Sequence, residues 1–583
     1  MDQRRNAKIV CTLGPASRDR DTVRALADAG MSVARLNASH GTPEDRRDAV
    51  EAVRAVDAAT GGPVAAMLDT QGPEVRTAPS EERVRLETGS TVRFEPGEAT
   101  TPERVGLSAS IAGVSPGDAV LLDDGRIETV VERVEGDVVV ARVESGGDLG
   151  GRKGVNVPGV DLRLDIVTEK DRRDLEFAAE AGVDFVAASF VRDGEDVLEV
   201  SETLESFGAD IPVVAKIERV GAVDNLESII DVAYGVMVAR GDLGVECPME
   251  DVPMIQKRII RRCQEAGVPV ITATEMLDSM VHQRRPTRAE ASDVANAVLD
   301  GTDALMLSAE TAVGDHPVRV VEAMDRIVRE IEASEEYAEI REQRVPTASE
   351  PRTEALARSA RYLARDLDAR AVVVASESGY TALKTAKFRP EVPVVAATPN
   401  DRVRRQLALS WGLHATYAGL GEKRALDVVE EAAQVALDAG VAESGDTVVV
   451  VSGMMTDIEG TDTANTLKVH VAAETLALGR AVVGGRAAGP VANVDADGDL
   501  GDVPDGAVLV LPDPFEAEFT GDLSRVGAIV APQESLTGYP AVVARELEVP
   551  MVGSATVDVP DGTVVTVDAE RGVVYGGEIR QRR

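Results

Sequence analysis

The chain has 583 residues, with 101 Asp and Glu against 62 Lys and Arg, which gives a formal net charge of −39. Single hydrophobic cores stop growing at about 250 to 300 residues, so we expect several domains. The acidic excess disfavours nucleic acid and anionic membrane surfaces as partners, because both bind accumulated Lys and Arg. No apolar run approaches the roughly 18 residues that a membrane span needs, so we expect no membrane association.

The acidic residues are spread along the chain, and lysine is rare beside arginine. We interpret this pattern as halophilic, that is, as adaptation to high salt, because screening makes a dense acidic surface tolerable. An ordinary acidic cytosolic protein is the alternative. The polar start, Met1 to Asn6, has no place for a secretory signal, so we expect a cytoplasmic protein. Cys11, Cys247 and Cys263 lack metal-ligand spacing and are expected to be reduced thiols that serve in packing.

Short apolar runs alternate with amphipathic stretches of helical length in the first part of the chain. Such runs are typical of parallel strands buried on both faces, and eight of them predict an α/β fold of the (β/α)8 TIM-barrel type. We place this catalytic barrel in residues 1–70 and 166–345. The predicted strands are Lys8–Leu13, Ser32–Leu36, Val64–Leu68, Asp184–Ser189, Val213–Ile217, Val236–Ala239, Val268–Ala273 and Ala304–Ser308.

One connection breaks this alternation. After Asp69, the next convincing helix begins only after Thr168, which is predicted as its N-cap ahead of Glu169 and Asp171. The interval holds Val- and Arg-rich alternation punctuated by turns such as Asp124-Gly125. We therefore predict an inserted small β-barrel over residues 71–165, a lid above the catalytic end of the barrel.

A charged stretch, Ala333 to Arg352, precedes a second β/α unit, which we place in residues 350–471 as a C-terminal α/β effector domain. Its predicted strands are Ala371–Ala375, Val392–Ala397, Thr447–Ser452 and Thr466–Val471. Residues 472–583 are Gly- and Val-rich and poor in helix, apart from a candidate at Tyr539–Leu547. They predict an appended, β-rich α/β domain.

Polar residues follow the predicted barrel strands, where the active residues of this fold lie. Taken singly, each is better explained as a buried ion-pair partner or a helix cap. Together they indicate a site that holds an anion with metal ions. The set is Arg35, Asn37, Ser39, Asp69, Thr70, Ser189, Lys216, Glu218, Arg240, Gly241, Asp242, Thr274, Ser308 and Glu310.

Two groups within this set are suited to cations. Glu218 and Asp242 end adjacent predicted strands and offer two carboxylates to a hard dication, whose other ligands come from substrate and water. The oxygens of Asn37, Ser39, Asp69 and the Thr70 carbonyl form a possible cage for a second, larger cation. The glycines within Ala239–Gly244 let backbone N–H groups approach a carboxylate or phosphate, although a glycine pattern alone is weak evidence.

Long segments of residues 1 to about 471 resemble the pyruvate kinase family, in the family's order. The segments are Val33–Gly41, Leu68–Thr77, Lys216–Glu218, Ala239–Gly244, Thr272–Met280, Pro286–Glu290, Ser292–Asp300 and Met306–Thr311. The appended region resembles the swivelling phosphohistidine domain of phosphoenolpyruvate-utilising enzymes through Thr537–Glu546.

The resemblance implies a glycolytic enzyme that transfers the phosphoryl group of phosphoenolpyruvate to ADP and releases pyruvate and ATP. It implies Mg2+ or Mn2+ on Glu218 and Asp242, and K+ on Asn37, Ser39, Asp69 and Thr70. It assigns catalysis to Lys216, Arg35 and Thr274, and substrate binding to Arg35, Lys216, Gly241, Asp242 and Thr274. It assigns nucleotide contacts to Asn37, His40, Arg76 and Lys153. The family also implies a homotetramer.

Two loops carry further implications. Asp124 and Lys153 match lid positions near the nucleotide, with a hairpin turn and a solvated loop as the alternatives. The segment Ser376–Thr381 matches the family's allosteric effector loop, through Ser376, Ser378, Gly379 and Thr381. It is also expected to contain a helix N-cap. Glu377 would oppose a strongly anionic ligand, so we predict that fructose 1,6-bisphosphate is not the main activator.

Two departures from the family pattern matter. Gln71 stands where potassium-dependent members carry Lys, but Glu74 is acidic and cannot replace the monovalent charge, so we expect K+ dependence. Tyr539 occupies the place of the phosphorylated His in the appended domain, so a structural or assembly role is expected there.

Two other functions are alternatives to the phosphoryl transfer that the resemblance implies. One is a dikinase-like phosphotransferase, which Tyr539 disfavours because it has no imidazole to carry phosphate. The other is a catalytically silent, effector-binding scaffold. The combined presence of Arg35, Lys216, Glu218, Asp242 and Thr274 argues against a silent protein, because such a protein has no chemical reason to keep all of these residue types.

Overall fold

The computed structural model describes residues 5–349, 352–419, 425–453, 464–533 and 536–579. The chain divides into two compact units, which are described separately. The first comprises Met1–Glu354, Glu377–Arg389 and Asn400–Tyr417, and the second comprises Ala355–Ser376, Pro390–Pro399 and Ala418–Arg583. The four predicted domain boundaries remain a prediction. No helix among the described residues is long and apolar enough to cross a membrane.

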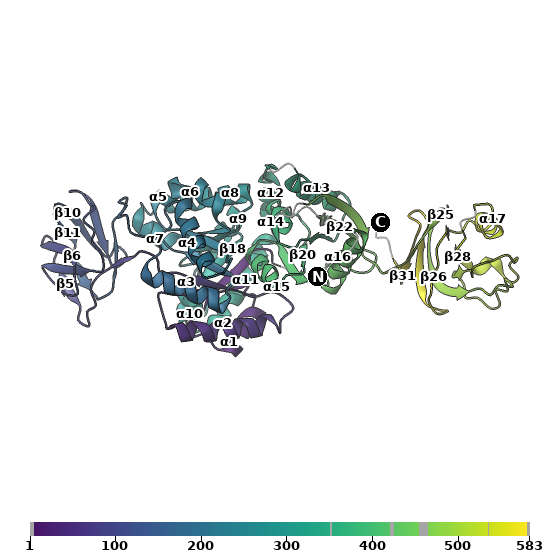
Figure 1. Ribbon diagram of the computed structural model, residues 1–583, viewed down its shortest axis with the longest axis horizontal. Coiled ribbons are helices and arrows are strands. Elements are labelled where there is room, and N and C mark those ends of the chain that lie inside the picture. The colour runs from purple at the N-terminus through teal and green to yellow at the C-terminus, as the bar shows by residue number, and fades with distance from the viewer. Residues whose placement is uncertain (1–4, 350–351, 420–424, 454–463, 534–535, 580–583) are drawn as a thin grey trace. The chain divides into compact units, whose positions relative to one another are not determined.

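The first unit contains a closed barrel of parallel strands ringed by helices (Figure 1). The order around the barrel is β1, β18, β17, β16, β15, β14, β3 and β2, which confirms the predicted barrel. The strands are β1 (Lys8–Thr12), β2 (Val33–Asn37), β3 (Ala65–Asp69), β14 (Phe185–Ala188), β15 (Val213–Ile217), β16 (Gly235–Ala239), β17 (Val270–Ala273) and β18 (Ala304–Leu307).

The helices of this unit alternate with the strands, and several begin with strong N-caps. Thr168 caps α3 in a capping box with Asp171, as predicted, and Thr42 and Thr287 cap α2 and α9 in the same way. The helices are α1 (Arg20–Asp28), α2 (Pro43–Asp57), α3 (Glu169–Ala181), α4 (Gly194–Ser206), α5 (Val220–Asp224), α6 (Leu226–Val232), α7 (Arg240–Glu246), α8 (Val252–Ala266), η1 (Asp278–Val281), α9 (Arg288–Asp300), α10 (Ala309–Ala312), α11 (Pro317–Glu332) and α12 (Glu335–Gln343).

Alternate residues of the barrel strands face two different cores. Val10, Met67, Phe185 and others fill the barrel interior, while the intervening residues pack against the helices. Because both faces of each strand are buried, the strands appear in sequence as continuous apolar runs.

The inserted region is built of strands, with no helix between β3 and α3 among the described residues. Its larger sheet has the order β4, β13, β9, β10, β11, β6, β8 and β7, and β5 pairs with β12. Asp123, Asp124 and Gly125 all have positive φ in the predicted turn between β9 and β10. The strands are β4 (Val75–Arg76), β5 (Val84–Leu86), β6 (Thr91–Pro96), β7 (Thr100–Thr101), β8 (Arg104–Leu107), β9 (Ala119–Leu122), β10 (Ile127–Glu135), β11 (Val138–Ser145), β12 (Gly147–Leu149) and β13 (Gly154–Asn156).

Four later elements belong to the first unit: α14 (Tyr380–Lys387), α15 (Asp401–Gln406), η2 (Leu407–Leu409) and β21 (Leu413–Tyr417). Ala408 and Leu409 of η2 join the apolar cluster inside the barrel. Arg404 and Arg405 of α15 form ion pairs with Asp57 and Asp184, with N–O distances of 2.6 and 2.9 Å. These partners lie at the N-terminal end of the barrel strands, away from the predicted site.

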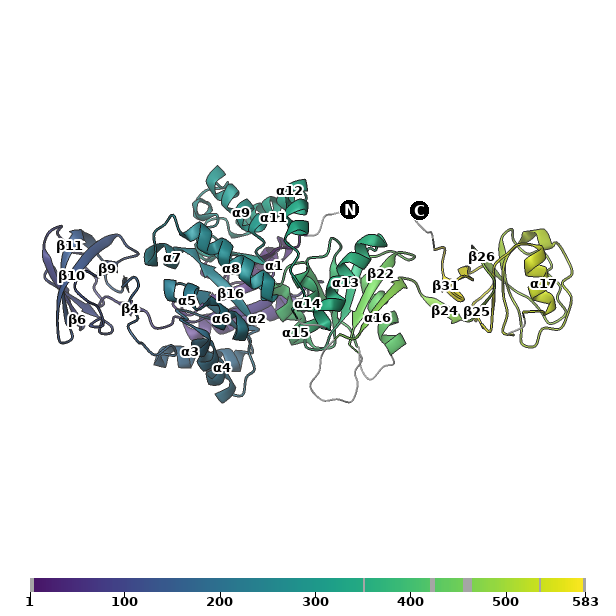
Figure 2. The ribbon, with the colours of Figure 1, turned by 90° about the horizontal axis from the view of Figure 1, so that it is seen from above.

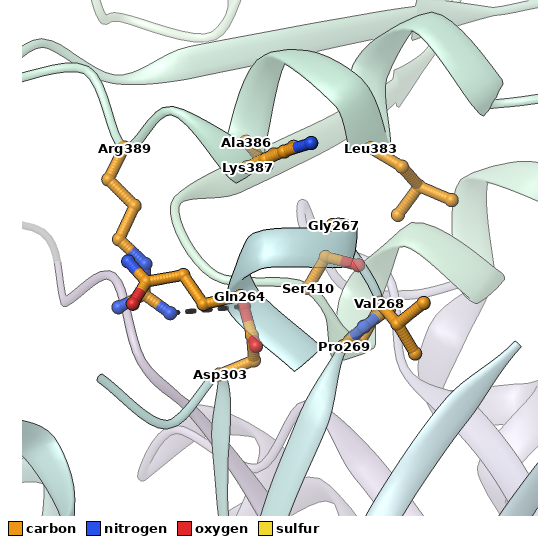
Figure 3. Close-up of a pocket in the computed structure, with 10 residues that line it drawn as sticks. All are labelled: Gln264, Gly267, Val268, Pro269, Asp303, Leu383, Ala386, Lys387, Arg389 and Ser410. Atoms are coloured by element: carbon orange, nitrogen blue, oxygen red, sulfur yellow. Dashed lines mark ion pairs between the residues drawn. The ribbon is translucent and has the colours of Figure 1, made fainter. Parts of the chain in front are cut away.

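A small cavity lies at the same end of the barrel (Figure 3). It is lined by Val268 and Pro269 ahead of β17, by Asp303 ahead of β18 and by residues of α14. Its volume of about 20 Å³ is close to the space that a single water molecule needs. Residues at this end of a TIM barrel usually contribute to stability, so the cavity is not a candidate active site.

The second unit contains α13 (Thr353–Asp366) from Ala355 onward, and α16 (Ala425–Asp438). It has a sheet that includes β20 (Val394–Thr398), β19 (Ala371–Ala375), β22 (Thr447–Ser452) and β23 (Thr466–Val471), in that order. It also contains a second sheet with the order β24, β31, β30, β26, β27, β28, β29 and β25. Its elements are β24 (Thr475–Leu478), β25 (Arg480–Val483), β26 (Arg486–Asn493), β27 (Ala507–Val510), η3 (Leu523–Arg525), β28 (Val526–Val530), α17 (Tyr539–Glu546), β29 (Met551–Gly553), β30 (Val564–Asp568) and β31 (Val573–Gly576). Figure 2 shows α17 beside this second sheet.

Two local features bear on the sequence predictions. The charged stretch Ala333–Arg352 is not only a linker, because α12 occupies part of it and buries Tyr337. The helix N-cap predicted in the effector loop is present, because Gly379 occupies the N-cap of α14 at φ 84°, and no side-chain hydrogen bond caps that helix. Glycine adopts this conformation at low cost, which removes the need for a polar cap residue.

Candidate active site at the mouth of the barrel

The C-terminal ends of neighbouring strands bring buried residues of opposite charge together. Arg35 Nε donates to Asp69 Oδ2 at 2.6 Å, and Arg35 Nη1 donates to Thr12 Oγ1 at 2.9 Å. Lys216 Nζ lies 3.2 Å from Asp69 Oδ1 and 2.8 Å from Glu218 Oε1. Four predicted site residues from three strands therefore form one network of alternating charge.

This network shifts the pKa values of its members. Burial disfavours the charged form of Asp69, but Arg35 and Lys216 outweigh it and lower the pKa of that carboxyl. Burial likewise opposes the charge on Lys216, but Asp69 and Glu218 raise its pKa above the ordinary value. Lys216 is therefore a permanent cation at the strand ends.

Glu218 and Asp242 are the predicted ligands of a dication. Burial raises the pKa of Glu218 to about 7, with Lys216 opposing the shift and Asp242 adding to it. Burial also raises the pKa of Asp242, again with Lys216 opposing. Burial disfavours the charged form of both carboxyls, and a divalent cation bound between them would offset this effect. Among the described residues, no group of three or more His, Cys, Asp or Glu is arranged to hold a metal.

The predicted K+ ligands lie at the ends of β2 and β3, where Asn37 and Asp69 are paired in register. Ser189 Oγ lies 3.2 Å from Asp69 Oδ1 and donates to the Thr70 carbonyl at 2.7 Å. Asn37 Oδ1 accepts a hydrogen bond from the Ser39 backbone at 3.0 Å. Carboxylate, amide and carbonyl oxygens are the ligands that hard cations prefer, so these residues fit such an ion.

Thr274 and Gly241 meet at the ends of β17 and β16. The Gly241 N–H donates to Thr274 Oγ1 at 2.8 Å, and Thr274 Oγ1 donates to the Ala273 carbonyl at 2.7 Å. Thr274 and Glu275 have positive φ, 68° and 54°, which costs non-glycine residues on the order of 1 to 3 kcal/mol each. Such strain persists where the surroundings hold it, and it is concentrated at functional sites.

The inserted region places two more predicted residues. Arg76 Nη2 lies 2.6 Å from Glu74 Oε2, and Arg76 Nη1 donates to the Arg152 carbonyl at 3.1 Å. Lys153 Nζ lies 2.7 Å from Asp123 Oδ1, next to the predicted lid residue Asp124. Both aspartates lie in the turn, and the register of the turn, which sequence alone leaves open, decides which one faces Lys153.

Glu74 connects the inserted region electrostatically with the barrel. Burial raises the pKa of its carboxyl, Arg76 opposes the shift, and the nearby charges of Glu218 and Asp124 add to it. The start of the inserted region therefore lies within electrostatic reach of the barrel-mouth carboxylates. His40 is exposed in the turn after β2, where its backbone N–H donates to the Asn37 carbonyl at 3.3 Å.

Comparison with known proteins agrees with this arrangement. Residues 4–321 match the pyruvate kinase barrel domain, residues 354–470 match the pyruvate kinase alpha/beta domain, and residues 503–572 match the mobile domain of PEP-utilising enzymes. Proteins named pyruvate kinase from Bacillus licheniformis, Geobacillus stearothermophilus and Sporosarcina psychrophila are 41%, 42% and 39% identical to the chain. Each alignment covers 98% of this chain and 99% of the relative.

The chain belongs to the pyruvate kinase family. It is accordingly an enzyme, a phosphotransferase, and both the predicted resemblance and the predicted fold class are confirmed. The match to the mobile domain of PEP-utilising enzymes also confirms the predicted resemblance of the appended region.

The predicted effector residues of this pyruvate kinase family member follow β19. Ser376 is buried at the end of that strand, and Thr381 is buried in the first turn of α14. The backbone N–H of Tyr380 lies 3.2 Å from Ser378 Oγ, and Gly379 is the N-cap. Their role in this chain stays a prediction.

Two participants in the barrel-mouth network were absent from the prediction. Thr12 ends the first strand and accepts from Arg35, and its place after an apolar run was a usable signal. The Phe190 backbone N–H donates to Glu218 Oε2 from a residue with φ 61°, and no sequence pattern marks a phenylalanine for that conformation.

Proposed function

We propose that the barrel mouth transfers the phosphoryl group of phosphoenolpyruvate to ADP and releases pyruvate and ATP in glycolysis. The observation that supports this proposal best is the position of Lys216, a buried cation held between Glu218 and Asp69, the carboxylate that also pairs with Arg35. Phosphoryl transfer depends on positioning and on stabilising negative charge, and fixed buried cations supply both.

The proposed roles follow from the contacts. Arg35 is held by Asp69 and Thr12, so its guanidinium is oriented to bind the phosphoryl group. Lys216 stabilises the charge on that group and on the enolate oxygen that it leaves. The Gly241 and Asp242 backbone amides, with Thr274, bind the substrate carboxylate. After transfer, enolpyruvate takes a proton at its methylene carbon, and we assign this step to Thr274 with a water molecule.

Glu218 and Asp242 would hold Mg2+ or Mn2+, and Asn37, Ser39, Asp69 and Thr70 would hold K+. When bound, these cations supply positive charge that offsets the charge of the phosphates. We propose that Asn37, His40, Arg76 and Lys153 contact the nucleotide. For K+, the test compares activity in KCl with activity in NaCl at equal ionic strength. A Gln71→Lys variant serves as the comparison, because it introduces the residue that other dependent members carry.

The deciding experiment measures pyruvate formation from phosphoenolpyruvate and ADP with Mg2+ at high KCl. Lys216→Met is compared with Lys257→Met, because Lys257 pairs with Asp300 away from the barrel mouth. We expect turnover in the native chain, a loss on the order of 10³-fold in Lys216→Met and little change in Lys257→Met. A folded native chain without turnover would favour the scaffold function instead.

We propose that the loop containing Ser376, Ser378, Gly379 and Thr381 binds an allosteric effector other than fructose 1,6-bisphosphate. The support is the acidic Glu377, which opposes two phosphate groups. Titration of activity with fructose 1,6-bisphosphate at saturating Mg2+ tests this assignment, and several-fold activation would contradict it.

We also propose a cytoplasmic, salt-adapted homotetramer. The net charge of −39 supports the salt adaptation, because mutual repulsion on an acidic surface weakens as salt screens it. Thermal unfolding should therefore shift to higher temperature as KCl rises from low to molar concentration. Analytical ultracentrifugation over the same range measures the assembly, and a monomer throughout would contradict the tetramer.

A further inference from the structure

The turn after β17 is held in a strained conformation by something outside itself. Thr274 and Glu275 both have positive φ, and neither is glycine. A pair of such residues adopts this conformation only when neighbouring groups determine it. The hydrogen bonds of the Thr274 side chain, from Gly241 and to Ala273, constrain its hydroxyl, and another group binds its carbonyl.

That group is the guanidinium of Arg240. Arg240 follows β16, which pairs with β17 in parallel, so its side chain reaches the end of the next strand. Nε donates to the Ala273 carbonyl at 3.0 Å, and Nη2 donates to the Thr274 carbonyl at 2.8 Å. Two successive carbonyls of the turn are thus bound by one planar group.

The opposite side of the same guanidinium is anchored to helices. Arg240 Nη1 lies 2.7 Å from Asp293 Oδ1 on α9 and 3.4 Å from Gln256 Oε1 on α8. The Arg240 side chain is 14% exposed and that of Asp293 is 35% exposed, so this ion pair is partly shielded from water. A lysine has a point charge with no fixed fork and cannot make the same set of contacts.

We propose that Arg240 is a positioning residue for the substrate carboxylate. It holds the Thr274 carbonyl, and the residue that follows it, Gly241, supplies the N–H that meets Thr274 Oγ1 at 2.8 Å. One arginine thereby sets the spacing between the two groups that the proposed function assigns to carboxylate binding. The inference rests on that proposed function and specifies how its carboxylate site is kept in place.

A purely structural arginine makes different predictions, and the chain offers a matched example. Arg54 Nη1 lies 2.7 Å from Asp184 Oδ2, and Arg54 Nη2 donates to the Gly182 carbonyl at 2.6 Å. Its contacts therefore resemble those of Arg240, but they lie at the opposite end of the barrel strands. If Arg240 acts only through stability, Arg240→Ala and Arg54→Ala should behave alike.

The test compares full-length native protein with Arg240→Ala, Arg240→Lys and Arg54→Ala. Steady-state kinetics gives kcat and both KM values, and calorimetry measures binding of phosphoenolpyruvate with Mg2+ in the absence of ADP. For Arg240→Ala we expect kcat/KM for phosphoenolpyruvate to fall on the order of 10²-fold, with the KM for ADP nearly unchanged. Arg54→Ala should lower the unfolding temperature and leave these constants unchanged.

Chemical rescue adds a measurement that a general loss of stability does not affect. Guanidinium at low millimolar concentration should restore part of the lost phosphoenolpyruvate affinity in Arg240→Ala, because the ion can occupy the vacated position. It should have no such effect on Arg54→Ala. Equal kinetic constants and equal phosphoenolpyruvate affinity in the two alanine variants would overturn the proposal.

If Arg240→Ala does not fold, Arg240→Lys decides the question in the same assays. An unchanged KM for phosphoenolpyruvate in Arg240→Lys overturns the positioning role, and a raised KM with an unchanged KM for ADP supports it. The calorimetric measurement separates the two proposals. A native chain that binds phosphoenolpyruvate without turnover contradicts the proposed function, while the difference between Arg240→Ala and Arg54→Ala in binding still tests Arg240.

Discussion

The mouth of the barrel and the first turn of α17 lie in regions that match two families of related chemistry, pyruvate kinases and PEP-utilising enzymes. At the barrel mouth, Arg35, Asp69, Lys216 and Glu218 are buried in direct contact with opposite charges. At α17, the Tyr539 ring lies 5.6 Å from that of Phe519, and its hydroxyl accepts a hydrogen bond from the Phe519 backbone at 3.2 Å.

A fold match does not by itself establish chemistry, which depends on the side chains at the site. The barrel keeps costly buried charges, which are stable only because each has partners. Tyr539, which we expect at the place of the family's phosphorylated His, has a phenol that packs against an aromatic ring, which favours structure over group transfer.

The largest expected effect concerns activity at the barrel mouth. Glu218→Gln removes a charge from the proposed dication site but keeps its shape, so we expect kcat to fall on the order of 10²- to 10³-fold. The Mg2+ concentration needed for half-maximal activity should rise. Steady-state kinetics across a Mg2+ titration checks both, and Glu227→Gln, at an exposed ion pair with Arg262, is the control. Unchanged Mg2+ dependence would remove Glu218 from the metal site.

The next effect concerns the segment that leads into the inserted region. Gly72 has φ 71°, and an added Cβ would lie 2.8 Å from the Ser189 carbonyl oxygen. Gly72→Ala should therefore displace the strand ends around Ser189 and lower kcat by about tenfold or more. Gly89→Ala is a matched control, because Gly89 has φ 84° but no atom within 4 Å of an added Cβ. An equal loss of kcat in the two variants would show that the backbone conformation, and not the contact with Ser189, causes the loss.

A smaller effect depends on pH and concerns a group with like charges around it. Burial, with Lys468 and Arg571 adding to the effect, lowers the pKa of His470 from 6.5 to about 4. Between pH 6.5 and 4 the unfolded chain binds more protons than the folded chain, so stability is complete above pH 6.5 and falls as the pH drops. We expect the shifted pKa of His470 to lower the free energy of unfolding by about 1 to 3 kcal/mol at pH 4, after allowance for the partial exposure of the ring.

Urea unfolding at pH 7 and pH 4.5 measures this dependence, with His470→Gln as the comparison. The variant lacks a titrating ring, so its stability should fall less between the two pH values. Parallel losses in both proteins would exclude His470 as the source.

The smallest expected effect concerns the stability of the region around α17. Tyr539→Phe removes one hydrogen bond with the Phe519 backbone, so we expect about 1 kcal/mol lower stability and nearly unchanged kcat and KM. Thermal unfolding and steady-state kinetics are the measurements. A marked loss of activity would mean that the appended domain takes part in the reaction.

Much of the fold could be predicted from local sequence patterns. The eight apolar runs predicted the barrel strands, and the Thr168–Asp171 spacing predicted the start of α3, because strand burial and helix capping act over a few neighbouring residues. The helix N-cap expected in the effector loop is present at Gly379, but the pairing of Lys153 with Asp123 depends on the register of a turn and was not predicted.

Sequence periodicity and composition were sufficient for the barrel, its insertion and the charged residues at the strand ends. Tertiary structure alone decided which of these residues touch. Lys216 meets Asp69 because β15 and β3 both flank β14, and Arg240 reaches the Thr274 carbonyl because β16 and β17 are neighbours. Partners so far apart along the chain meet only when the barrel closes, and the charge that each neighbour then supplies sets the protonation of the site.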